Sequence, residues 1–147
     1  MANKKHVDQL RQGVAAWNQW RTQHPAVVPD LSEEDLSRER LEGADLSRAN
    51  LHKTDLSYAK LTLGANLHEA DLPGANLSFA DLHSALIEKA NLGGANLHQA
   101  NLHFANLRDA DLSGADLSDA DMIGAKLSGA DLRGAERSRR EAFPSSC

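Results

Sequence analysis

A large apolar residue, usually Leu, recurs at every fifth position between Leu46 and Leu132, with one slip of a single residue. A small residue, Ala or in one unit Thr54, stands two places before each of them. On an α-helix, positions five apart would spiral around the cylinder, and on a straight strand they would alternate between the two faces. The pattern therefore predicts a chain that turns at every unit and returns each Leu to the inside of a coil.

Four such units with four corners make a square coil of about 20 residues, and stacked coils pair along the axis at about 4.8 Å. Residues 20 apart then form columns, and one column is Gly74, Gly94, Gly114 and Gly134. A type II turn needs a positive φ at its third residue, where glycine is least strained. These glycines therefore predict one edge of the coil.

The slip lies in residues 61–64, where one unit has six residues, and it predicts a bulge at a corner. Once the extra residue is counted, Tyr58 and Phe79 are one coil apart. Their rings are then placed to stack on each other.

The units Ala44-Asp45-Leu46-Ser47-Arg48, Ala75-Asn76-Leu77-Ser78-Phe79 and Ala115-Asp116-Leu117-Ser118-Asp119 resemble the A(D/N)LXX consensus of the pentapeptide-repeat family. The resemblance covers residues 44–134. It implies an all-β solenoid, a right-handed quadrilateral β-helix of about five coils with Leu and Ala inside. Characterised members of the family act mainly by binding, so the resemblance implies no enzymatic activity.

Residues 30–43 keep the Leu spacing but lose the small residue. Glu34 and Glu39 occupy the inward position there, and a carboxylate inside an apolar tube is unfavourable. The first coil is therefore expected to be either open to solvent at these positions or irregular, and we favour an irregular first coil. A short capped helix, beginning at Ser32-Glu33-Glu34-Asp35, is the alternative.

Residues 1–29 change period. Apolar residues recur at spacings of three and four, which predicts an amphipathic helix over residues 4–22 that ends before His24-Pro25: Val7, Leu10, Val14, Trp17 and Trp20. Solenoid ends need a cover over their apolar interior and unpaired edges. We expect this helix to cap the N-terminal end. A partner-binding or self-association helix is the alternative, since it holds both tryptophans.

Residues 135–147 form a C-terminal tail with little apolar content. The tail either adds a short cap through Ala142 and Phe143 or frays. Cys147 is interpreted as a terminal residue without a functional role rather than as the site of an intermolecular disulfide. Quinolone-resistance members of the family dimerise through longer and more apolar C-terminal elements. A homodimer is one alternative for the oligomeric state, but a dimer of that kind is not predicted.

The formal net charge is −5, and the acidic charge lies in the solenoid because residues 1–29 and 137–147 are basic on balance. A nucleic-acid groove should be basic, so no direct nucleic-acid binding is expected. No apolar run approaches the roughly 20 residues of a membrane span, and no apolar stretch follows Lys4 and Lys5 to form a secretory signal. We expect a cytoplasmic protein with no membrane partner.

No catalytic constellation, cofactor site or metal site is predicted. His83 and His103 should lie one above the other, but no carboxylate or thiolate completes a ligand set. The chain is therefore expected to be a non-enzymatic interaction scaffold that presents a rigid acidic β-helical surface to a protein partner. Its candidate contacts are the large outward residues: Trp17, Trp20, Tyr58, Phe79, Leu86, Phe104 and Ile123.

The acidic rod also suggests a second function, a DNA mimic that inhibits or protects a type II topoisomerase, as some family members do. Asn residues dilute the charge of the middle coils: Asn66, Asn76, Asn91, Asn96, Asn101 and Asn106. Asp and Asn at these positions have a simpler expected role, which is to satisfy backbone groups at the corners.

Overall fold

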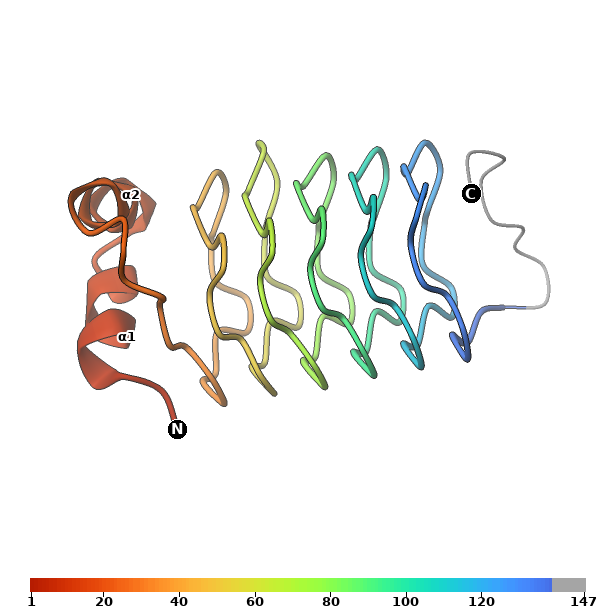
Figure 1. The fold of residues 1–147 in the computed structure, drawn as a ribbon, viewed down its shortest axis with the longest axis horizontal. Helices are drawn as coiled ribbons and strands as arrows, with labels where there is room; N and C mark the ends of the chain where they lie inside the picture. The colour runs from red at the N-terminus through yellow and green to blue at the C-terminus, as the bar shows by residue number, and fades with distance from the viewer. Residues whose placement is uncertain (139–147) are drawn as a thin grey trace.

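Two short helices lie at one end of a stack of coils in the computed structural model, which describes residues 1–138 (Figure 1). Helix α1 spans Lys4–Arg11 and helix α2 spans Val14–Gln23. Gly13 between them has a φ of 106°, far from helical values, so the chain turns and a second helix begins. The prediction of one helix over residues 4–22 is therefore wrong.

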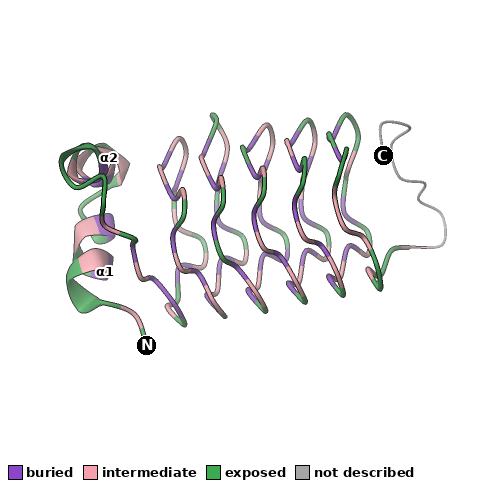
Figure 2. Cartoon of the chain, viewed as in Figure 1, coloured by how far each residue is buried: buried purple, intermediate pink, exposed green. Residues whose placement is uncertain are grey.

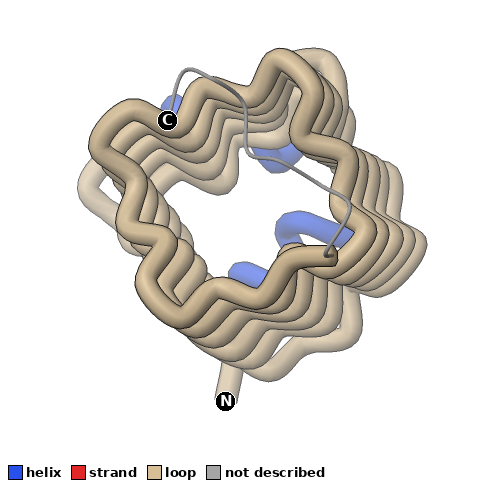
Figure 3. The backbone as a smooth tube through the Cα atoms, turned by 90° about the vertical axis from the view of Figure 1, so that its right-hand side faces the viewer, coloured by secondary structure: helices blue, strands red, loops and turns tan. Residues whose placement is uncertain are grey.

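The coil has four sides, as the view along its axis shows (Figure 3). Parallel β-bridges join residues 20 apart, or 21 apart across the slip, and begin with the pair Asp30 and Asn50. Each side is named here by its column of bridged residues: face 1 (Asp30, Asn50, Asp71, Asn91, Asp111, Asp131), face 2 (Asp35, Asp55, Asn76, Asn96, Asp116, Glu136), face 3 (Arg40, Lys60, Asp81, Asn101, Asp121) and face 4 (Asp45, Asn66, Leu86, Asn106, Lys126). Corners 1 to 4 are the turns that follow faces 1 to 4.

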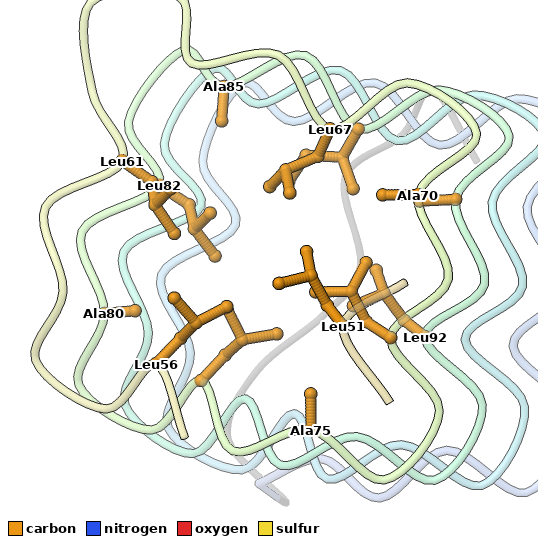
Figure 4. Close-up of a cluster of buried hydrophobic side chains, with 14 of the residues drawn as sticks. Leu51, Leu56, Leu61, Leu67, Ala70, Ala75, Ala80, Leu82, Ala85 and Leu92 are labelled. Carbon is orange, nitrogen blue, oxygen red and sulfur yellow. The ribbon is translucent and has the colours of Figure 1, made fainter. Parts of the chain in front are cut away.

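The interior is made of the Leu and Ala columns. Their side chains point into the lumen in the close-up (Figure 4), and buried residues recur along every coil (Figure 2). From Leu31 to Leu117 the Leu column is at most 3% exposed, and Ile87 fills one of its positions. Ala fits the second inward position because so narrow a lumen leaves no space for another large side chain.

In a regular five-residue unit, the second residue after the inward Leu lies at the corner and has a positive φ. In corner 1 these residues are Glu33 and Lys53 in the first two coils and then the four glycines of the predicted edge, with φ between 53° and 72°. A hydrogen bond closes each such turn, for example from the Ala75 N–H to the Leu72 carbonyl at 3.1 Å. The predicted glycine corner is confirmed, and residues other than glycine adopt the same backbone at many of the other corners.

The six-residue unit is confined to corner 3, as predicted. The bridge separation is 21 residues at Asp45 and Asn66, and it is 20 again at Asn66 and Leu86. Two successive residues, Leu63 and Gly64, have positive φ values of 53° and 72°. The extra residue therefore bulges outward and leaves the stacking of the coils intact.

Residues 30–43 follow the same bridge pattern as the later coils, so neither the expected irregular coil nor the alternative helix is present. What differs is the interior, where Glu34 and Glu39 are half-buried at the end of the stack. Arg11 of α1 reaches both carboxylates, at 3.9 Å from Glu34 Oε2 and 3.3 Å from Glu39 Oε1. The cap thus supplies the charge that these two inward carboxylates require.

The predicted C-terminal cap through Ala142 and Phe143, together with Cys147, lies outside the described residues. Within residues 1–138, neither helix is long and apolar enough to span a bilayer.

Candidate protein-interaction surface

Trp17 is the centre of the N-terminal cap. It is fully buried, and its indole N–H donates to the Asp45 carbonyl at 2.8 Å. The neighbouring Asn18 side chain donates to the Gly43 carbonyl and accepts the Asp45 N–H, at 3.0 and 2.8 Å. Asn18 thereby replaces the coil that would otherwise pair with this edge of face 4. Because Trp17 is inaccessible, the prediction that it contacts a partner is wrong for this folded state.

Arg21 fastens α2 to corner 4. Its guanidinium donates to the Val27 and Ser47 carbonyls at 3.0 and 2.7 Å. Its Nε is buried without a hydrogen-bond partner and lies 3.7 Å from the Asp45 carboxylate. Burial lowers the pKa of Arg21, and Asp45 opposes that shift. The hydrogen bonds of Arg21 therefore hold the cap in place together with the buried Trp17 ring.

Trp20 is half-buried in an aromatic cluster of the cap. Its ring centroid lies 5.1 Å from that of Trp17 and 5.2 Å from those of His6 and His24. His6 Nδ1 accepts the Asp30 N–H at 2.9 Å, which requires this nitrogen to be unprotonated. Burial lowers the pKa of His6, and Arg21 adds to the shift while Asp30 opposes it.

Corner 2 carries a ladder of stacked side chains. Tyr58 and Phe79 lie parallel, with ring centroids 4.7 Å apart, which confirms the expected stack. The Arg38 guanidinium covers the Tyr58 ring at 4.5 Å, and His98 meets Phe79 edge-on at 5.7 Å. The ring faces are therefore occupied within the chain, although both rings remain exposed to solvent.

Corner 3 carries a second, less complete cluster. His83 and His103 lie in one column with ring centroids 5.5 Å apart, and Phe104 packs against His103 at 4.4 Å. A side chain at Gly124 would clash with the Phe104 ring, and the positive φ of 72° also favours glycine there. Phe104 nevertheless remains more than half exposed. No group of three or more His, Cys, Asp or Glu within residues 1–138 is placed to hold a metal ion.

Charge is divided unequally between the faces. Every charged residue in the bridged columns of faces 1 and 2 is a carboxylate, whereas faces 3 and 4 hold cations and carboxylates in equal number. Many Asp and Asn residues accept the N–H of the residue two places on, as Asp116 does from Ser118 at 2.9 Å. The Ser118 hydroxyl, which also donates to Asp116, holds the pKa of that carboxyl below its usual range. Satisfying corner N–H groups therefore accounts for much of the Asp and Asn content.

The model of the family described as pentapeptide repeats matches residues 30–62, 64–99 and 100–135, with eight copies. The chain belongs to the pentapeptide repeat family. Members of this family form right-handed quadrilateral β-helices, which confirms the predicted solenoid but not the predicted number of coils. The match begins at residue 30, in agreement with the regular pairing of the first coil.

Several solved pentapeptide repeat proteins are similar to this chain. Rfr23 from the cyanobacterium Cyanothece 51142 is 38% identical over 71% of this chain and 64% of its own, with a TM-score of 0.43. HetL from the cyanobacterium Nostoc sp. strain PCC 7120, which is involved in heterocyst differentiation regulation, is 36% identical over 72% and 65%, with a TM-score of 0.25. The plasmid-mediated fluoroquinolone resistance protein QnrB1 is 21% identical over 76% and 73%, with a TM-score of 0.42.

The chain thus spans less than two thirds of the length of Rfr23 and of HetL. None of the curated proteins matches it.

The pentapeptide repeat makes the departures from its pattern easy to locate. Leu86 takes an outward Asp or Asn position on face 4 and is exposed, and Ile123 on corner 3 is 66% exposed. Leu63, the extra residue of the bulge, is 81% exposed and was not among the residues predicted from sequence. Its place in the only six-residue unit between residues 46 and 132 was the signal that could have identified it.

Together, the structure brings Leu63, Phe104 and Ile123 onto corner 3, with Leu86 on the adjoining face. Tyr58 and Phe79 lie one corner away. Trp20 belongs to α2 of the cap, which lies at the end of the rod (Figure 1).

Proposed function

We propose that this protein is a non-enzymatic scaffold that binds a protein partner along corner 3 and the adjoining face 4. One observation carries the proposal. Large apolar side chains, namely Leu63, Leu86, Phe104 and Ile123, stay exposed on a rod whose other outward positions are mostly polar. Clustered exposed apolar residues with a polar surround are typical of protein-binding surfaces.

The rod is suited to this role because its backbone is fixed by pairing between coils. Corner residues keep their spacing of about 4.8 Å along the axis, so about five coils present a line of contacts roughly 25 Å long. A preformed surface loses little conformational entropy when a partner binds. Among the bridged columns, carboxylates without accompanying cations are confined to faces 1 and 2. These two faces would repel acidic proteins and attract a basic partner.

A pull-down from the native host tests the proposal. Wild-type protein is compared with Phe104→Ser and Ile123→Ser together, and with Asp71→Asn and Asp111→Asn together as a control on face 1. We expect a discrete partner to be retained by the wild type and the control and lost from the apolar-corner variant. A partner bound equally by all three would place the interface elsewhere.

A DNA-mimicking inhibitor or protector of a type II topoisomerase is the second candidate. The observation that favours it is the collection of carboxylates on the adjoining faces 1 and 2. A supercoiling assay with purified type II topoisomerase tests it, with Asp55→Asn and Asp116→Asn as the variant. Neither inhibition nor drug protection by the wild type would exclude this function.

A further inference from the structure

We propose that a second copy of this chain covers corner 3, in an antiparallel side-by-side dimer whose two-fold axis lies between the two rods, perpendicular to them and level with the midpoint between His83 and His103. The inference rests on the proposed function, because both place a protein interface at this corner. It goes further by identifying the partner and the register.

The apolar pattern along corner 3 is self-complementary. Successive coils place Leu63, then His83, then His103 with Phe104, and then Ile123 at this corner. An isologous contact matches each residue with its counterpart on a reversed copy. Reversal about the midpoint sets Leu63 against the partner's Ile123 and His83 against the partner's His103. The two most exposed apolar residues of the corner would then cover each other.

Face 3 beside this corner is also complementary in charge. The same two-fold axis brings Lys60 beside the partner's Asp121, and it brings Asp81 beside the neutral Asn101 of the partner subunit. Sliding the partner by one coil either way instead opposes Asp81 with the partner's Asp81 or with the partner's Asp121. Like charges across an interface are destabilising, so charge selects the register that also matches the apolar residues.

Faces 1 and 2 do not allow the same arrangement. Reversal about the same level would bring Asp55 of face 2 beside the partner's Asp116, and Asp30 of face 1 beside the partner's Asp131. Corner 3 with its flanking faces is the side of the rod, within the described residues, where a second copy meets both apolar surface and balanced charge.

The contact is small. From Leu63 to Ile123 it runs over three coil spacings, about 14 Å. Such a strip buries less than the roughly 800 Å² per partner of a stable complex. We therefore expect a dimer that dissociates on dilution, with half-association at roughly 0.1 mM or above.

Cross-linking tests the register. In a Cys147→Ser background, Leu63→Cys protein is mixed with Ile123→Cys protein and treated with a short bismaleimide. Positions 63 and 123 of different copies would be adjacent, whereas two copies of position 63 would lie about 14 Å apart. We expect the mixture to yield covalent dimer at least tenfold more efficiently than either variant alone. Equal yields in all three samples, or no dimer in any, would overturn the proposal.

Sedimentation equilibrium on the full chain tests whether Lys60 and the partner's Asp121 attract each other in the dimer. Lys60→Asp should weaken dimerisation several-fold, and the double variant with Asp121→Lys should restore it to within about twofold. Leu63→Asn, which keeps a residue that tolerates positive φ, should weaken it roughly tenfold. Tyr58→Ser on corner 2 is the matched control and should leave it unchanged.

A wild-type protein that stays monomeric up to about 1 mM would overturn the dimer. If a different protein is still captured through Phe104 and Ile123, the proposed function stands while this inference fails. If Leu63→Asn and Lys60→Asp dimerise as the wild type does, the interface lies elsewhere on the chain.

Discussion

The first coil and the coils after residue 44 share one backbone pattern and differ in what fills the second inward position. In the later coils this position is Ala, with Thr54 in one unit, and it is buried from Ala44 to Ala125. In the first coil it holds Glu34 and Glu39, which are half-buried and contacted by Arg11. The column of large apolar residues runs through both regions from Leu31 onward, and both regions pair in the same way although the second inward position differs.

The comparison shows that position along the rod decides which side chains the interior accepts. A middle coil is covered on both sides by other coils, so a carboxylate there would have neither water nor a cation. The first coil is covered by α1, whose Arg11 is an amphipathic cation that reaches over the edge. The end of a solenoid can therefore carry charge that its middle cannot.

The largest loss of stability is expected when a carboxylate is placed inside a middle coil instead of the first coil. Ala100 is buried in a middle coil, and Ala100→Glu is expected to reduce the free energy of unfolding by at least about 4 kcal/mol. Glu39→Ala in the first coil is the matched control and should change it by about 0.5 kcal/mol or less. Urea denaturation followed by circular dichroism measures both. Similar losses for the two variants would contradict the difference between the coils.

Removing the centre of the cap should have the next largest effect. Trp17→Ala leaves a large cavity over the first coil and removes the bond to the Asp45 carbonyl, so we expect a loss of about 3–5 kcal/mol. Amide hydrogen exchange should show the loss of protection beginning in the first coil. Trp20→Ala, which removes a half-buried ring, should cost less, and the opposite order would disprove the assignment of Trp17 as the cap centre.

Acidification should loosen the cap through His6. Burial lowers the pKa of His6 in the folded protein, so the folded state binds a proton less readily than the unfolded chain. The stabilisation is complete above the ordinary histidine pKa of about 6.5 and is lost as the pH falls from there toward the lower folded value.

The loss is expected to be about 1 kcal/mol, the value of the bond from the Asp30 N–H. His6→Gln keeps an acceptor that does not titrate, so its unfolding free energy between pH about 7.5 and 5 should fall less than that of the wild type. Parallel pH profiles for the two proteins would exclude this role.

The smallest effect is expected at Arg11. Its ion pairs are nearly half exposed to solvent, so Arg11→Ala should destabilise by about 0.5 kcal/mol at low salt and by less at high salt. A double-mutant cycle with Glu39→Ala measures the coupling directly. A coupling of zero would mean that solvent alone accommodates these carboxylates.

Much of the candidate surface could be predicted from the repeat. The position of a residue within the 20-residue coil assigns every outward residue to a face or corner. The stack of Tyr58 on Phe79 and the exposure of Ile123 follow from such counting. Leu63 was missed because the pattern treats an inserted residue as a defect in register. Its exposure depends on the outward direction of the bulge, which the spacing does not fix.

The sequence by itself determined the four-sided coil, the glycine corner and the place of the slip, because a five-residue period repeats one local geometry many times. Only the tertiary structure decided that residues 1–23 form two helices, that Trp17 is buried, and that Arg11 meets Glu34 and Glu39. The last two of these features depend on contacts between segments more than 20 residues apart that occur once in the chain. A contact that occurs once leaves no periodic trace, so its partners become apparent only when the chain is folded.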